Sequence, residues 1–297
     1  MRQLLLSVYI FTFLTGLPTN MLAFWTFFWK LRRRAAPIDV LLLNLTISDL
    51  IFLAFLPFQM KVAYDNMTWT LGFPLCPITS FIFYVPIYNS TLLLTAVSVE
   101  RYLGVAYPLR YSLCRRPLYA TLACVMFWAM TSLNLSIVYI IPYIQWLNST
   151  TTPLTCYQDF TEDQYAIVGR VRFELFFVLF CIPLVICSFC YINFIVILSR
   201  LPNISRRRRL RAIGLAVGTL FTFVVCFGPY NVSHVVGFVQ DESQSWRIVV
   251  LLLSTLNACL DPFIFYVSSA AVRRMIHRCF NSIAAKLHIL KCGGTAS

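Results

Sequence analysis

The sequence predicts an all-α membrane protein in which seven membrane-spanning helices form one bundle. Of its 297 residues, 59% are hydrophobic and 12% are charged, whereas a soluble domain carries about 25% charged residues. The apolar residues gather in long stretches, each about long enough to cross the ~30 Å hydrocarbon core of a bilayer. We expect a single domain over residues 1–297. Its spans are expected at 5–29, 37–62, 75–105, 118–142, 168–198, 208–239 and 247–268.

Lys and Arg side chains crowd the connections on one side of these spans. They follow the first, third and fifth spans and recur in the tail after the seventh. Because cytoplasmic loops carry an excess of Lys and Arg, we expect an extracellular N-terminus and a cytosolic C-terminus at the plasma membrane. The same pattern explains the net charge of +13. Cations that border apolar spans meet anionic inner-leaflet lipid, so membrane lipid and not nucleic acid is the expected partner.

The two ends of the chain carry features other than a plain membrane span. Residues 1–30 could be a secretory signal, but the apolar run is too long and no small-residue cleavage site follows it, so we interpret it as the first spanning helix. After the seventh span, residues 270–280 alternate cationic and apolar side chains. This pattern predicts a short amphipathic helix at the cytosolic membrane interface. Cys279 near its end is a candidate for palmitoylation, with an unmodified thiol as the alternative.

The 11 cysteines fall into groups according to whether they lie inside a span, on the cytosolic side or on the extracellular side. Most lie inside spans, where a thiol acts as a small hydrophobic group, or on the reducing cytosolic side. Cys76 opens the third span and Cys156 lies in the loop after the fourth, both on the extracellular side. We expect a disulfide that tethers this loop over the bundle; the alternative is two unpaired thiols. The same side carries glycosylation sequons at Asn148 and, closer to the membrane, at Asn66.

Ionisable side chains inside apolar spans are costly and mark function by default. Arg172, His234 and Arg247 belong to the extracellular third of the fifth, sixth and seventh spans. A guanidinium binds a carboxylate through two parallel hydrogen bonds, so two guanidiniums with an imidazole predict an anion site. The alternative is that both arginines extend to the outer membrane interface. Cations are disfavoured on that side, which favours the anion site.

Short motifs occur once per span and in order along nearly the whole chain. They are Gly16–Asn20, Leu43–Leu50, Glu100–Tyr102, Trp128, Pro183 with Tyr191, Cys226–Pro229, and Leu260–Pro262 with Tyr266. Together they resemble the rhodopsin-like G-protein-coupled receptors. The resemblance implies the same seven-helix fold. It also implies signalling to a heterotrimeric G protein of the Gi/o class, the Gq class or both, with arrestin as a further partner.

The resemblance also implies a polar site near the middle of the bundle. Asp49, Ser90, Asn257 and Asp261 resemble the family's sodium and water site. Carboxylate and neutral oxygen ligands suit a hard cation. The alternative is a hydrogen-bond network without an ion. We expect no other cofactor and no other metal.

The third span ends like the family's cytosolic switch. There, Glu100 holds Arg101 while the receptor is inactive, and activation releases Arg101 toward the G protein; Tyr102 completes the motif. Tyr191 resembles the active-state partner of Arg101, and Tyr266 resembles the seventh-span tyrosine.

The chain departs from the family pattern in ways that affect this switch. Phe227 stands where the family usually has tryptophan, and Tyr266 comes one residue late. The family's acidic partner for Arg101 at the base of the sixth span is missing, because 206–211 contains only Arg and Leu. We therefore expect Glu100 alone to restrain Arg101, in a shallow inactive state.

Longer stretches are similar to a narrower group, the short-chain free fatty acid receptors of types 2 and 3. The most specific stretch runs from Cys226 to His234. The resemblance implies that Arg172 and Arg247 bind the ligand carboxylate and that His234 assists. Asn134 stands where the family has a fourth-span histidine. The other residues expected at the ligand site are Tyr84, Tyr88 and Tyr230, which match pocket positions, and Glu174, which would partly neutralise the arginines.

These observations predict a G-protein-coupled receptor activated by short-chain fatty acids of the acetate, propionate and butyrate class. One alternative is a receptor for another small anion such as a hydroxycarboxylic acid. A second is a carboxylate transporter, although an odd number of spans argues against the paired inverted repeats of many transporters. No paired-carboxylate, Cys/His or metal-ligand cluster indicates catalysis, so we do not expect an enzyme.

Overall fold

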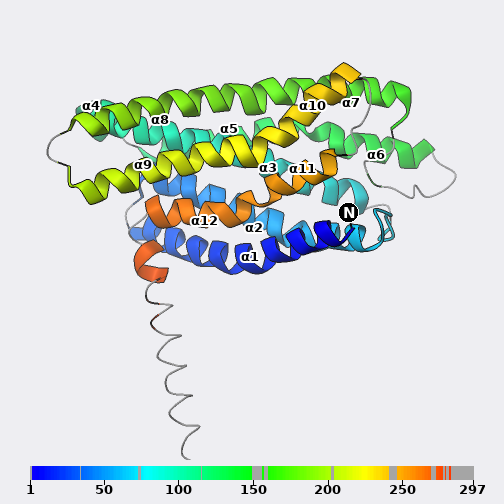
Figure 1. The fold of residues 1–297 in the computed structure, drawn as a ribbon, viewed down its shortest axis with the longest axis horizontal. Coiled ribbons are helices and arrows are strands. Elements are labelled where there is room, and N and C mark those ends of the chain that lie inside the picture. The colour runs from blue at the N-terminus through cyan, green and yellow to red at the C-terminus, as the bar shows by residue number, and fades with distance from the viewer. Residues whose placement is uncertain are drawn as a thin grey trace, which may run out of the picture.

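The computed structural model describes residues 2–33, 35–72, 75–114, 116–148, 156, 160–201, 204–240, 246–268, 272–276, 278 and 281. The described chain is helical almost throughout, and its long helices run side by side (Figure 1). The helices are α1 (Arg2–Arg33), α2 (Pro37–Tyr64), α3 (Leu75–Ala106), α4 (Pro108–Cys114), α5 (Pro117–Asn134), α6 (Ser136–Asn148), α7 (Glu162–Leu175), α8 (Ile182–Arg200), α9 (Arg206–Phe221), α10 (Gly228–Gln240), α11 (Arg247–Thr255) and α12 (Asn257–Ser268).

In the described part of the chain, seven helical spans are long and apolar enough to cross a membrane, which confirms the predicted fold class. Helices α1, α2 and α3 each form one span. The fourth combines α5 and α6, and the seventh combines α11 and α12. In the fifth and sixth, short π-helical segments join two helices: η1 (Phe176–Cys181) links α7 to α8, and η2 (Thr222–Phe227) links α9 to α10.

Proline explains where the two π-helical segments lie. Pro183 follows η1 and Pro229 follows η2 at the same offset. A proline inside a helix cannot donate its backbone hydrogen bond, and its ring crowds the carbonyl one turn earlier. A π-type turn relieves that crowding by widening the helix locally.

The fifth span starts earlier than the sequence indicated, at Glu162 instead of 168. Thr161 caps the helix: its hydroxyl accepts a hydrogen bond from the backbone N–H of Gln164, and the Gln164 side chain accepts one from the backbone N–H of Thr161. This reciprocal arrangement stabilises a helix start in polar sequence. The apolar pattern begins later than the helix, so hydropathy alone placed the boundary inside it.

Close packing of α1 explains one motif of the first span. A Cβ atom on Gly16 would lie 3.2 Å from the Leu53 side chain of α2 and 3.4 Å from the Ala258 carbonyl oxygen of α12. The buried Asn20 amide donates to the same carbonyl oxygen at 2.8 Å. Small size at Gly16 and a polar link at Asn20 therefore hold three helices together.

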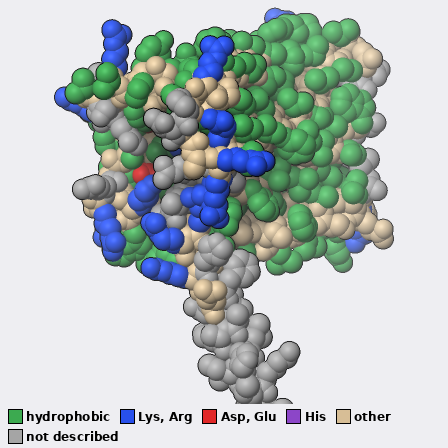
Figure 2. All heavy atoms as spheres, turned by 60° about the vertical axis from the view of Figure 1, so that its left-hand side comes forward, with side chains coloured by type: hydrophobic (Ala, Val, Ile, Leu, Met, Phe, Trp, Pro, Cys, Tyr) green, Lys and Arg blue, Asp and Glu red, His purple; other side chains and the backbone are tan. Residues whose placement is uncertain are grey.

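The two ends of the bundle differ in charge. Lys and Arg side chains gather at one end, whereas hydrophobic side chains cover the flank beside it (Figure 2). We call this the basic end; it holds Lys30, α4 and the first turn of α9. The opposite end, which we call the disulfide end, holds Cys76 and the first turns of α7 and α11.

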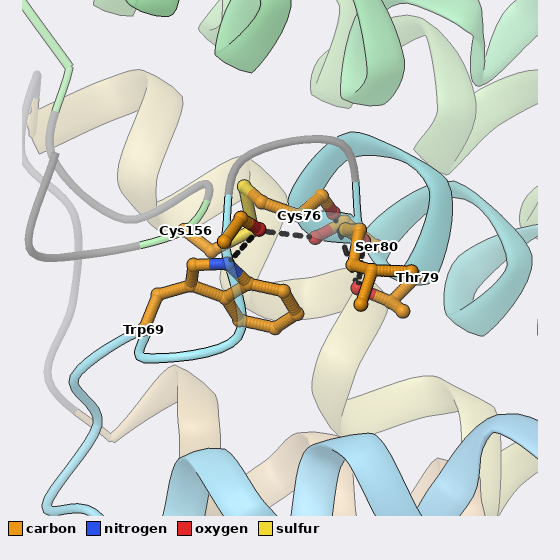
Figure 3. The surroundings of a disulfide bond; sticks show 7 residues. Trp69, Cys76, Thr79, Ser80 and Cys156 are labelled. Atoms are coloured by element: carbon orange, nitrogen blue, oxygen red, sulfur yellow. Dashed lines mark hydrogen bonds between the residues drawn. A yellow bond between two sulfur atoms is a disulfide. The ribbon is translucent and has the colours of Figure 1, made fainter. Parts of the chain in front are cut away.

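The predicted disulfide is confirmed. Cys76 at the start of α3 bonds to Cys156, with an S–S distance of 2.09 Å (Figure 3). The Ser80 hydroxyl lies 3.2 Å from the Cys156 sulfur, one turn further along α3. Beside the bond, the Trp69 indole N–H donates to the Gly72 carbonyl oxygen at 2.7 Å (Figure 3). The bridge ties the segment before α7 to the disulfide end.

The segment after the seventh span is described only in part. Residues 272–276 are helical, with Val272 buried and Arg274 exposed, as in an amphipathic helix. Arg273 donates to the Tyr266 carbonyl oxygen at 3.0 Å, which links this turn to α12. Cys279 lies outside the described residues.

Candidate functional site

A small cavity lies inside the disulfide end. Arg172 of α7 and Arg247 of α11 both line it. Arg172 is only 7% exposed, so its side chain does not extend to the outer surface as the alternative interpretation required. The other predicted residues on its wall are Tyr84 and Tyr88 of α3 and Tyr230 and His234 of α10.

Hydrogen bonds and ring contacts order this polar wall. The Tyr88 hydroxyl and His234 Nε2 lie 2.6 Å apart, and Arg247 Nη2 donates to the Tyr230 hydroxyl at 3.0 Å. The Tyr230 ring stacks parallel to Tyr84 at 6.4 Å and meets His234 edge-on at 4.7 Å. Helices α3, α10 and α11 are therefore joined through one tyrosine cluster.

The charge in the cavity is positive. Among the described residues that line it, two are arginines and none is Asp or Glu. His234 Nδ1 is buried with no hydrogen-bond partner in the described chain. Two guanidiniums and an imidazole on one wall favour a small anion between them. The remaining wall is apolar: Leu135, Ile137, Val138, Val168, Val171 and Leu175.

Glu174 does not belong to this cavity. It is exposed and lines a neighbouring groove between α6 and α7, together with Asn134 and Gln164. The reason is helical geometry: residues two apart point about 200° apart around the axis, so Arg172 and Glu174 face different sides of α7. The prediction that Glu174 contributes to the ligand site was therefore wrong in its geometry. Asn134 also lies outside the cavity, with its amide donating to the Met130 carbonyl oxygen.

Sequence reasoning missed an aromatic contact at this site. Phe160 lies in the segment between the disulfide and α7, and the Arg172 guanidinium sits 5.4 Å from its ring centroid. Such a cation–π contact holds the guanidinium in place without neutralising it. The only signal in the sequence was an aromatic residue shortly after Cys156.

The polar residues predicted near the middle of the bundle lie close together. Asp49, Ser90 and Asn257 line a small cavity. Asp261 is fully buried and accepts a hydrogen bond from the Asn257 amide at 3.0 Å, and its carboxyl lies against that of Asp49. One oxygen each of Asp49, Asn257 and Asp261 is buried with no hydrogen-bond partner in the described chain. These oxygens fit a hard cation such as sodium.

At the basic end, Glu100 has a partner that the sequence did not predict. The Tyr111 hydroxyl of α4 donates a hydrogen bond to Glu100 of α3. Tyr111 was not predicted; its position follows from the short helix that Pro108 begins. Glu100 is therefore already engaged by a neighbour other than Arg101.

The switch tyrosines occupy three different surroundings. Tyr191 is buried, and its hydroxyl donates to Thr219 of α9 at 3.2 Å. Tyr102 packs edge-on against Tyr107 and against Phe189 of α8. The Tyr266 carbonyl oxygen accepts the hydrogen bond from Arg273.

The sequons lie toward the disulfide end. Asn66 is exposed in the turn after α2, with a positive φ of 54° that asparagine tolerates well. Asn148 ends α6; its side chain and the rest of its sequon lie outside the described residues.

Comparisons with known proteins agree with this architecture. Residues 19–265 match the model of the 7 transmembrane receptor (rhodopsin family). The chain is 52% identical to free fatty acid receptor 3 of Mus musculus over 278 residues, which cover 93% of this chain and 86% of the relative. It is 50% identical to free fatty acid receptor 3 of Homo sapiens, over 91% of this chain and 78% of the relative. It is 48% identical to free fatty acid receptor 2 of Mus musculus, over 92% and 83% respectively.

Proposed function

The chain belongs to the rhodopsin family of seven-transmembrane receptors, and on that premise we propose that it is a G-protein-coupled receptor for short-chain fatty acids. Its relatives named free fatty acid receptors support a fatty acid as ligand. The family consists of signalling receptors, so the chain is not an enzyme. The proposal rests most directly on one observation: Arg172 and Arg247, from two different spans, line one small cavity that no described acidic residue shares.

The cavity suits a carboxylate with a short tail. Each guanidinium offers a planar pair of N–H donors that matches a carboxylate. His234 and the tyrosine hydroxyls supply further polar contacts, and the apolar side chains of the wall would face the alkyl group of the ligand. A ligand of this size binds weakly. At about −1.5 kcal/mol per heavy atom, acetate with ~4 atoms reaches about −6 kcal/mol, a Kd near ~40 μM at best.

Activation follows from the charge in this cavity. In the empty site the two guanidiniums repel each other, and a bound carboxylate removes that repulsion. The ligand therefore favours arrangements in which α7 and α11 approach each other. A ligand shifts an equilibrium only through such a difference in affinity between two states. The resulting movement of the fifth and seventh spans would reach the switch residues at the opposite end.

The proposal also covers the orientation of the receptor, its cytosolic partners and its sodium site. Its disulfide end faces the outside and its basic end faces the cytosol, so that the cations meet anionic lipid and a heterotrimeric G protein. The G protein is of the Gi/o class, the Gq class or both, and arrestin binds the same end after activation. Sodium at Asp49, Ser90, Asn257 and Asp261 stabilises the inactive state. The partnerless oxygens of this site support that assignment.

The test is a G-protein activation assay in cells across straight-chain acids of two to six carbons. Arg172→Ala and Arg247→Ala, with surface expression measured, should each lose the response to propionate by about 100-fold or more, since each leaves a buried charge unmatched. Arg172→Lys keeps the charge and loses the planar pair of donors, so we expect a large but incomplete loss.

Two further measurements separate the alternatives. Stronger responses to lactate or 3-hydroxybutyrate than to propionate would identify a hydroxycarboxylic acid receptor. Uptake of radiolabelled propionate that depends on the protein would identify a transporter. Normal propionate responses from both alanine variants would overturn the proposed site.

A further inference from the structure

The groove between α6 and α7 is separate from the cavity that Arg172 and Arg247 line, which we call the arginine cavity. The groove has a volume of about 540 Å³ and lies at the disulfide end, where both helices are found (Figure 1). On α7 its wall runs from Gln164 to Glu174, so at about 1.5 Å per residue it is about 15 Å long. Gln145 of α6 donates a hydrogen bond to the Gln164 side chain at 2.8 Å, which bridges the two helices there.

Most of the groove wall is apolar and faces the surroundings of the bundle. Leu133 in this wall is 74% exposed, so the groove opens toward the membrane. An alkyl chain that enters from the membrane would meet a continuous apolar surface. The isoleucines of the wall are Ile137, Ile140, Ile141, Ile144 and Ile167.

Glu174 gives this groove a negative charge. Its side chain is exposed, and it lies inside the fifth span. The ion pairs in the described part of the chain do not include it, and no described Lys, Arg or His lines the groove. An ionisable group within a spanning segment is costly and marks function by default. The wall therefore presents a carboxylate for which a ligand can supply the cation.

Asn134 and Ser136, at the junction of α5 and α6, add hydrogen-bond acceptors to the same wall. The Asn134 amide nitrogen donates to the Met130 carbonyl oxygen at 2.8 Å, which leaves the amide oxygen for a ligand. The Ser136 hydroxyl donates to the Leu133 carbonyl oxygen at 2.8 Å, which leaves its lone pairs. An ammonium group has three N–H donors and no acceptor, so it matches a carboxylate accompanied by neutral oxygens.

Helix α7 separates two sites of opposite charge. Arg172 lines the arginine cavity, and Glu174 lines the groove. Ile137 and Val171 belong to both walls, so a single layer of side chains lies between the two sites. A carboxylate is attracted on one side of α7 and repelled on the other, and the reverse holds for a cation. The groove is therefore suited to a ligand of the opposite charge to that of the arginine cavity.

We propose that the groove binds an amphiphile that has a primary ammonium head and an alkyl chain and enters from the membrane. The head donates hydrogen bonds to Glu174, Asn134 and Ser136, and the chain lies along the isoleucines toward Gln164. A phospholipid is a poorer match, because its head also carries a phosphate that Glu174 repels. This inference goes beyond the proposed function and does not depend on which anion the arginine cavity binds.

Photolabelling of the full chain in lipid nanodiscs tests the site directly. The probe is decylamine with a photoreactive diazirine on its chain, and the corresponding decanol is the matched neutral probe. Mass spectrometry of the labelled peptides should locate the amine on α6 and α7, and excess unlabelled decylamine should remove that label. Glu174→Gln should lower labelling by the amine about threefold to fivefold, as for a partly exposed charge pair, and leave labelling by decanol unchanged.

Three further variants separate the charge of Glu174 from the shape of the groove. Glu174→Asp keeps the carboxylate and should retain most of the labelling by the amine. Glu162→Gln is the matched control, because Glu162 is exposed in the first turn of α7 and does not line the groove; labelling should not change. Ile140→Trp narrows the groove with a larger apolar side chain and should lower labelling of α6 and α7 by both probes.

Two results would overturn the proposal. Equal labelling by decylamine and decanol, unaffected by Glu174→Gln, would mean that the groove takes ordinary lipid chains. A disulfide that joins two copies of an Ile140→Cys variant in the membrane would identify a second copy of the chain as the occupant. Labelling is measured without propionate, so its failure leaves the proposed receptor function standing. Conversely, a chain that ignores propionate but shows the labelling expected for Glu174 keeps the ammonium site and loses the fatty acid assignment.

Discussion

At the scale of single residues, Tyr230 is the link between the arginine of α11 and the aromatic wall of the cavity. Its hydroxyl accepts a hydrogen bond from Arg247, and its ring contacts Tyr84 and His234. Tyr230→Phe keeps the ring and removes the acceptor. Since a hydrogen bond to a charged group contributes about 1.5 kcal/mol, the half-maximal propionate concentration should rise about tenfold. Dose–response curves corrected for surface expression measure this shift.

Glu174 provides the matching control, because it lies on the same helix as Arg172 but outside the cavity. It is exposed and lines the neighbouring groove, so Glu174→Gln should change the half-maximal concentration by less than about twofold. A larger effect than that of Tyr230→Phe would mean that α7 presents its other face to the ligand. That result would contradict the geometry that separates Arg172 from Glu174.

At the scale of elements, the disulfide positions the segment that enters α7. Cys156 is tied to α3, Phe160 contacts Arg172, and Thr161 caps the helix. These features follow one another within a few residues. The disulfide and the cap at Thr161 therefore both fix the position of the start of α7. The bridge therefore orders one of the two guanidiniums that face the cavity.

Replacing both bridged cysteines, Cys76→Ser with Cys156→Ser, should weaken the propionate response even of the receptor that folds and reaches the cell surface. The released segment no longer holds Phe160 against Arg172, and we expect about a tenfold rise in half-maximal concentration. Cell-surface dose–response assays measure it. Cys181→Ser removes a thiol that forms no disulfide and serves as the control. Equal loss in both variants would point to a general effect of serine in the bundle.

How far the sequence predicted these elements depends on the kind of signal. The length of the apolar stretches identified the seven spans, because every helix that crosses a bilayer needs enough apolar residues to span its hydrocarbon core. It misplaced the start of α7, because the capping residues Thr161 and Gln164 are polar. Charge and motif identified Arg172 and Arg247 as a pair, since few cations tolerate that depth.

The contacts that the sequence did not predict involve the direction of side chains. Glu174 was assigned to the site because its carboxylate would partly neutralise the arginines, whereas the turn of the helix directs it away. Tyr111 was missed because it lies in α4, outside the span that holds Glu100. Pairing across elements needs the packing of α3 and α4, which no single span encodes.

At the scale of the whole molecule, the separation of charge gives the protein a direction in the membrane. Cations gather at the basic end (Figure 2). The disulfide, Asn66 and the end of α6 at Asn148 belong to the other end. Each Lys or Arg near anionic lipid contributes about 1 kcal/mol, so inserting the molecule the other way round would forfeit several such contacts. The charge pattern, the redox requirement of the disulfide and the sequons thus favour the same orientation.

An epitope tag at each terminus tests this orientation. We expect antibody to reach an N-terminal tag on intact cells and a C-terminal tag only after permeabilisation, because the positive end stays in the cytosol. Asn148→Gln should also reduce the mass of the protein by one glycan, measured by electrophoresis with and without glycosidase. Asn203→Gln, at a sequon on the basic side, is the control and should leave the mass unchanged. Labelling of the C-terminal tag on intact cells would reverse the assignment of the two ends, and with it the direction in which a ligand at Arg172 and Arg247 could signal.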